Sequence, residues 1–220
     1  MINNILRAVG KAYKVFAASY THGKNTDEMF KIFENSLKSS LGEYTMVYDY
    51  IWGKDTAGVD GVTKNYIPKV GDTLIMDVSV SVGNTYCDVC RTFFVGEPTE
   101  EQTEAYYTVL KSLRAGSSAL KAGVKASDVY IAANSVYAAV GKELIHHAGH
   151  RVGNKPVMEP DFVKDEESLI EEGLIYTVET GLYNGFGIRL ENDFLVKKDG
   201  ALDLFEEILP LDDIKEYILK

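Results

Sequence analysis

Cysteine, tryptophan, histidine and proline are all scarce in this chain of 220 residues, which contains two, one, four and five of them. No continuous apolar run approaches the roughly 18 residues that a membrane-spanning helix needs, so no transmembrane segment is predicted. Arg7, Lys11 and Lys14 interrupt the apolar residues near the N-terminus. This pattern is typical of an amphipathic helix and not of a signal peptide, and it predicts a cytoplasmic protein.

Positive charge is also in short supply, with 23 Lys and Arg against 33 Asp and Glu and a net charge of -10. Nucleic acids and anionic membranes attract basic surfaces, so neither is expected as a main partner. The hydrophobic share of 45% and the charged share of 25% are those of an ordinary globular protein. The length suits one large domain or two small ones.

The two cysteines, Cys87 and Cys90, lie on either side of Asp88 in a CxxC spacing. A redox pair of this kind normally begins a helix, whereas these residues fall in a predicted strand. No second cysteine pair is present to complete a structural zinc site. We therefore expect two reduced thiols.

Residues 72 to 96 predict a β-hairpin, because apolar residues alternate along both arms of a Gly83-Asn84 turn. Asp77 and Asp88 interrupt the apolar pattern, and we expect them to face each other. Two buried carboxylates repel and raise one pKa unless a cation lies between them. They are either ligands of a cation or a pair of solvated strand residues.

Residues 173 to 200 predict a second hairpin of the same character, with Glu179 and Glu191 in place of the aspartates. The acids are 11 residues apart in the first hairpin and 12 in the second, and a helix start lies 50 or 51 residues before each. This spacing indicates an internal duplication with a period near 100. We expect a single α+β domain over residues 1–220, with pseudo-repeats at about 1–97 and 98–205.

The remaining elements follow from apolar periodicity and capping signals. Capping boxes are predicted at Asn25 with Glu28 and at Thr99 with Gln102, and Ser127 is predicted to cap the following helix. The expected helices cover 3–20, 25–37, 98–120, 128–144 and a short piece from 212, and the further expected strands cover 44–52 and 205–209.

Three of the four histidines, His146, His147 and His150, lie within five residues. Such a cluster at a helix end is often only solvated, but four acids that lack a cation favour a ligand role. Four carboxylates and one imidazole suit two divalent metals, with Mn²⁺ favoured by the oxygen ligands and Zn²⁺, Co²⁺ or Fe²⁺ also accepted. Two metals roughly 3.5–4 Å apart can share a hydroxide and clamp a carbonyl group.

The order and context of these residues resemble the pita-bread metallopeptidases, namely methionine aminopeptidase, aminopeptidase P and prolidase. The resemblance covers essentially the whole chain and is nearest to the aminopeptidase P and prolidase branch, without the separate N-terminal domain of those enzymes. It implies the pita-bread fold, with two helix-helix-hairpin halves around a central curved antiparallel sheet. The matching stretches are 75–78, 88–93, 149–153, 176–179 and 187–196.

By this resemblance, Asp77 would chelate one metal, Asp88 and Glu191 would bridge both, and His150 and Glu179 would complete the other shell. Glu179 would also be the general base. The expected catalytic residues are Glu179 and His150. The residues expected to contact substrate are Asp60, His146, Arg151 and Arg189.

The resemblance implies an exopeptidase that removes the N-terminal residue of dipeptides or short peptides, with Xaa-Pro substrates among them. The expected partner is the peptide, and a homodimer is compatible with this interpretation.

Two departures from the family pattern favour an alternative. Val157 stands where the family carries a second histidine, and Asp60 stands near the place of a histidine that contacts substrate. Arg151 replaces a small residue beside His150. The alternatives are a pita-bread module that binds a peptide or protein without cleaving it, and hydrolysis of a non-peptide C–N bond.

Overall fold

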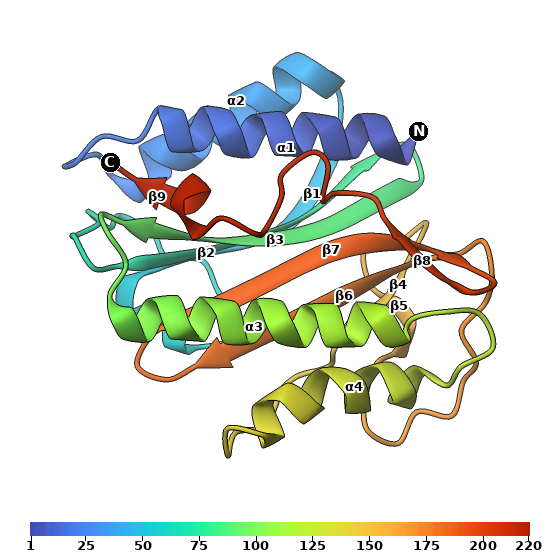
Figure 1. The fold of residues 1–220 in the computed structure, drawn as a ribbon. Coiled ribbons are helices and arrows are strands. Elements are labelled where there is room, and N and C mark those ends of the chain that lie inside the picture. Colours follow the sequence, from blue (N-terminus) through green and yellow to red (C-terminus); the bar gives the residue numbers. More distant parts are fainter.

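The computed structural model describes residues 1 to 220, and its centre is a curved, mostly antiparallel sheet (Figure 1). The strand order is β1-β2-β3-β7-β6-β4-β5, with β8 beside β7 and β9 parallel to β3. The strands are β1 (Thr45–Trp52), β2 (Thr73–Val82), β3 (Thr85–Val95), β4 (His150–Val152), β5 (Met158–Asp161), β6 (Ile175–Tyr183), β7 (Gly187–Lys197), β8 (Gly200–Asp203) and β9 (Ile218–Leu219).

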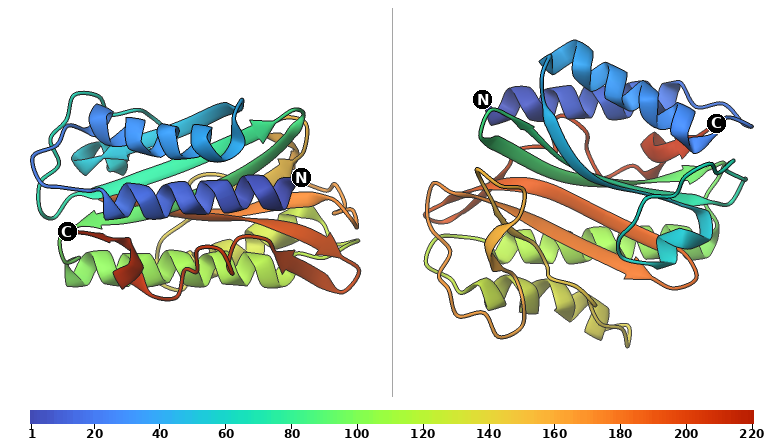
Figure 2. Two further views of the ribbon diagram at one scale, coloured as in Figure 1. Left: turned by 90° about the horizontal axis from the view of Figure 1, so that it is seen from above. Right: turned by 180° about the vertical axis from the view of Figure 1, so that it is seen from behind.

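One helix pair lies over each half of the sheet, and Figure 2 shows the two pairs from two further sides. The Tyr13 hydroxyl donates to the carbonyl of Met76 at 2.9 Å, which joins α1 to β2. The Thr180 hydroxyl donates to the carbonyl of Val109 at 3.0 Å, which joins β6 to α3. The helices are α1 (Ile2–Ala18), α2 (Thr26–Leu41), α3 (Glu100–Ala119) and α4 (Ala126–Ala138), with short 3-10 helices η1 (Gly53–Ala57) and η2 (Ile214–Tyr217).

The helices cover the sheet face that carries the apolar residues of both hairpins, among them Met76, Val78 and Leu190 in the main core. Successive strand residues point to opposite faces. Asp77 and Glu191 therefore lie on the other face, away from the helices. No helix is both long enough and apolar enough to cross a membrane.

Both hairpins are confirmed, but the pairing of the first corrects one expectation. Asp77 lies opposite Cys90, and Asp88 lies opposite Ser79. The two aspartates are thus diagonal neighbours on one face and do not face each other directly. The expectation was wrong because the tight turn at Gly83-Asn84 fixes the register, and that register offsets the two acids by two residues.

Cys87 and Cys90 are both free and buried. Cys87 belongs to the main core beneath the helices, whereas Cys90 packs with Ile51 and Ile75 on the other face. Positions three apart on a strand point to opposite faces, so these thiols cannot join in a disulfide without breaking the strand.

The capping predictions hold fully at one helix, hold in part at a second and fail at a third. Thr99 and Gln102 form the predicted capping box. The Asn25 side chain caps α2 through the N–H of Asp27, but Glu28 does not complete the box predicted there. α4 begins at Ala126, one residue before the predicted Ser127 cap. The Asp128 carboxylate accepts the N–H of Lys125 at 3.1 Å, and this contact places the start of the helix nearer the N-terminus than predicted.

The C-terminal part also differs from expectation. A strand was predicted at 205–209, but this segment forms turns. The Asp203 carboxylate accepts the N–H groups of Phe205 and Glu206 at 2.8 and 2.9 Å, which bends the chain there. The short helix predicted from residue 212 is the 3-10 helix η2, followed by β9.

Candidate metal centre

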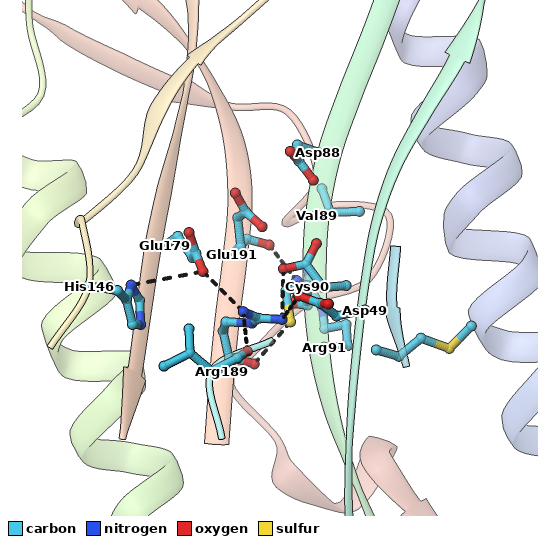
Figure 3. Close-up of polar contacts among 12 residues, drawn as sticks. Asp49, Asp88, Val89, Cys90, Arg91, His146, Glu179, Arg189 and Glu191 are labelled. Atoms are coloured by element: carbon cyan, nitrogen blue, oxygen red, sulfur yellow. Dashed lines mark hydrogen bonds and ion pairs between the residues drawn. The ribbon is translucent and has the colours of Figure 1, made fainter. Parts of the chain in front are cut away.

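A row of acidic side chains crosses the sheet on the face away from the helices. The strand register places Asp49 opposite Asp77, Asp77 opposite Cys90, Cys90 opposite Glu191, and Glu191 opposite Glu179. Directly paired residues point to the same face of a sheet. Five adjacent strand positions thus bring four carboxylates and one thiol together, and Figure 3 shows the acids converging.

Asp88 and Glu191 meet His150 beside this row. The Nε2 atom of His150 lies 3.7 Å from Asp88 Oδ2 and 3.8 Å from Glu191 Oε1, and all three side chains are buried. Their ligand atoms lie within 4.8 Å of one another. Two oxygens and one imidazole nitrogen at this spacing suit a divalent ion.

The orientation of His150 fits a ligand role. Its Nδ1 lies 3.2 Å from the carbonyl oxygen of Arg151, so the neutral ring donates there and leaves the Nε2 lone pair facing the carboxylates. Burial lowers the pKa of His150, which keeps the ring neutral. The neutral ring is the form that binds a metal.

The carboxylates lack enough positive charge around them. Burial, followed by repulsion from neighbouring acids, raises the pKa of Asp88 and of Glu191 well above the usual range. Burial raises the pKa of Asp77 to about 7, although Arg189 opposes the shift. Asp88 Oδ1 and Glu191 Oε1 are buried without a hydrogen-bond partner. These residues therefore fit a pair of divalent cations, which would satisfy both unpartnered oxygens.

Glu179 has the opposite electrostatics. Burial works against its ionisation, but His146, His147 and Arg189 outweigh burial and lower its pKa to about 2. His147 Nδ1 lies 3.4 Å from Glu179 Oε2, and Arg189 Nη1 lies 3.6 Å from Oε1. Glu179 is therefore an ionised carboxylate at neutral pH, held between the guanidinium group of Arg189 and the imidazole of His146 (Figure 3).

Arg189 is the one fixed cation among these acids. Its Nη2 lies 2.8 Å from Asp49 Oδ2 and 3.3 Å from Asp77 Oδ2, and its Nη1 donates to the carbonyl of Val59 at 3.0 Å. Asp49 was not among the predicted site residues. The sequence contains one indication of its role, since Asp49 is an aspartate inside an expected strand. Only the β1–β2 register shows that Asp49 lies opposite Asp77.

Replacing Arg189 with methionine should destabilise the metal-free protein by about 3–5 kcal/mol, because Asp49 and Asp77 would lose the one cation that offsets their carboxylates. Chemical denaturation in the presence of a chelator measures this change. Arg114→Met is the matched control, since Arg114 pairs with Asp212 on the exposed surface and should cost less than about 1 kcal/mol. Equal losses in the two variants would contradict a structural role of Arg189 in the site.

A cavity of about 180 Å³ opens over this cluster. Its lining includes the five predicted ligands and, around them, Asp60, His147 and Val157. The two positions that depart from the family pattern, Asp60 and Val157, therefore both border the site.

The other residues predicted to contact substrate take different places. Arg189 lines the cavity but is buried among carboxylates. His146 lies behind Glu179, where its Nε2 is 3.3 Å from the Tyr183 hydroxyl. Arg151 pairs with Tyr176, whose ring packs in the core, and it does not line the cavity.

Comparison with solved structures confirms the pita-bread fold. The prolidase from Pyrococcus furiosus superposes with a TM-score of 0.87 at 26% identity, over 93% of this chain and 62% of that chain. The X-Pro aminopeptidase from Thermotoga maritima gives a TM-score of 0.85 at 23% identity, over 93% of this chain and 60% of that chain, which supports the fold alone.

Among curated proteins, the Xaa-Pro dipeptidase of Pyrococcus furiosus is 28% identical over 207 residues, which are 91% of this chain and 59% of the relative. The chain thus spans less than two thirds of the length of that relative. The pattern of metallopeptidase family M24 matches residues 1–198. With the fold and the cluster of carboxylates and histidines in agreement, this match shows that the chain belongs to metallopeptidase family M24.

Proposed function

We propose that this protein is a metal-dependent exopeptidase that removes the N-terminal residue of dipeptides or short peptides, Xaa-Pro peptides among them. The observation that carries the proposal is the buried cluster of Asp88, His150 and Glu191, with Asp77 and Glu179 beside it. The names of its relatives, which include Xaa-Pro dipeptidases and a prolidase, support the substrate class.

Two divalent ions are the proposed cofactors, and the oxygen-rich ligand set favours manganese. Asp77, Asp88, His150, Glu179 and Glu191 would hold them. When bound, the ions would polarise the scissile carbonyl and lower the pKa of the attacking water. Their four positive charges would also offset the repulsion that raises the pKa values of Asp88 and Glu191.

Glu179 is the proposed general base. Its carboxylate is ionised and lines the cavity, so it can take the proton of the attacking water and return it to the leaving amine. Arg189 and His147 contact its two oxygens and fix its orientation. His147 also lines the cavity, where it can donate a hydrogen bond at a site in which Val157 offers none.

The test is hydrolysis of a library of dipeptides and Xaa-Pro peptides by protein loaded with Mn²⁺, Co²⁺ or Zn²⁺. We expect cleavage after the first residue, loss of cleavage with a chelator, and recovery when the metal is restored. Absence of cleavage of every peptide by the metal-loaded protein would contradict the proposal. The peptide-binding module without peptidase activity would then be the better interpretation, since Val157 and Asp60 replace two histidines of the family pattern.

A further inference from the structure

The loop from Val59 to Thr63 is tied firmly to the outer edge of β1. The N–H of Tyr50 donates to the carbonyl of Gly61 at 3.0 Å, and the N–H of Thr63 donates to the carbonyl of Tyr50 at 2.8 Å. Tyr50 and Val62 form a parallel bridge. This part of β1 therefore gains a short additional strand partner, and the loop has a defined position.

The Asp49–Arg189 ion pair holds the same loop from inside the site. Asp49 Oδ1 accepts the N–H of Gly61 at 2.9 Å, and Arg189 Nη1 donates to the carbonyl of Val59 at 3.0 Å. Asp60 lies between these two anchored residues. The backbone of Asp60 is therefore held at the cavity, which lowers the cost of placing its carboxylate there.

Asp60 lines the cavity as an exposed residue, and its carboxylate makes no hydrogen bond or ion pair within the protein. Every other carboxylate of the lining has an assigned partner. Asp49 pairs with Arg189, and the remaining four are the proposed metal ligands. The carboxylates of the lining are Asp49, Asp60, Asp77, Asp88, Glu179 and Glu191.

The charges of the cavity leave one carboxylate uncompensated. Two divalent ions would supply four positive charges and Arg189 a fifth, against the six carboxylates of the lining. The two unpartnered buried oxygens, Asp88 Oδ1 and Glu191 Oε1, belong to the metal ligands. Asp60 is exposed, so its carboxylate can pair with a cation that arrives with the substrate without giving up a partner in the protein.

Apolar groups lie beside this charge. Val47 and Val157 also line the cavity, and these residues are 58% and 52% exposed. An aliphatic stem that ends in an ammonium group presents both features, because its methylene groups cover apolar surface while the charge meets a carboxylate. The compact ammonium suits a cavity of about 180 Å³ better than a bulky planar cation does.

We propose that Asp60 is a specificity-determining residue that recognises a primary ammonium group of the substrate. This inference rests on the proposed peptidase function, because it names a substrate feature of the same cavity. The ammonium has two sources in a peptide, the N-terminal amine and the side chain of an N-terminal lysine, and the experiment distinguishes them.

The experiment measures the affinities of four related amides for the Zn²⁺-loaded protein by titration calorimetry at about pH 7. Hexanamide has no amine, 2-aminohexanamide has only the N-terminal amine, 6-aminohexanamide has only the side-chain amine, and lysinamide has both. We expect the amide with the recognised amine to bind about tenfold more tightly than hexanamide. This advantage should disappear in Asp60→Asn and persist in Asp199→Asn, which removes an exposed charge from the β7–β8 turn.

An advantage of 6-aminohexanamide would identify the lysine side chain, and an advantage of 2-aminohexanamide would identify the N-terminal amine. Equal affinity of all four amides, no binding of any of them, or an advantage that Asp60→Asn leaves intact would overturn the inference. Binding does not require hydrolysis. An Asp60-dependent preference in a protein that cleaves no peptide would therefore refute the peptidase function and leave the ammonium site standing.

Discussion

An Asp88→Ala variant should purify with far less metal than the native chain, which we expect to carry close to two divalent ions. Asp88 is a predicted bridging ligand, and its Oδ2 lies 3.7 Å from His150 Nε2 in a buried cluster. Loss of a shared ligand weakens both sites at once, and peptide hydrolysis should fall by more than the roughly 10–100-fold that loss of an outer-shell partner costs. Elemental analysis of protein purified without chelator gives the metal content.

The same variant should not unfold. In the metal-free protein, Asp88 is a buried carboxylate whose pKa is raised by burial and by the charge of Asp77. Removing it relieves that repulsion, so the melting temperature in chelator should equal or exceed that of the native chain. Asp199→Ala, on the exposed β7–β8 turn, is the control and should change neither quantity. A native protein that takes up no metal even with added Mn²⁺ or Zn²⁺ would mean that the acids are stabilised in another way.

The sequence alone was sufficient for the fold class and for the residue types of the cluster. Asp77, Asp88, Glu179 and Glu191 are charged residues in otherwise apolar strands, and such a pattern is conspicuous because it is costly without a cation. The hairpin turns fix on which face each acid lies. The structure brings these four acids and His150 into one cavity, as that pattern predicts.

The contribution of Asp49 could not be predicted, because it depends on pairing between strands distant in sequence. Only the β1–β2 register places Asp49 opposite Asp77, and only the position of β7 brings Arg189 between them. Arg189 was therefore expected at the substrate, whereas the structure pairs it with carboxylates. Local competition explains the smaller errors, since the Asp128 and Asp203 side chains each capture backbone N–H groups and shift the predicted boundaries.

A Glu179→Gln variant should lower kcat by about 10²–10⁴-fold while it retains much of its metal. The amide oxygen of glutamine can still approach a metal ion, but the amide cannot take up a proton at neutral pH. In the native chain, the pKa of Glu179 is lowered to about 2 by His146, His147 and Arg189 against the effect of burial. The base is thus fully ionised at neutral pH, and the substitution removes its function at once.

Measuring kcat and metal content in parallel shows whether Glu179 acts as the general base or only as a metal ligand. Glu172→Gln is the matched control, because Glu172 is exposed just before β6 and should leave kcat unchanged. If Glu179 only held metal, the loss of kcat would follow the loss of metal and would be recovered in excess Mn²⁺. A variant with full metal content and more than about a tenth of the native kcat would rule out Glu179 as the general base. Proton transfer would then be assigned to His147, the remaining nitrogen base that both lines the cavity and contacts Glu179.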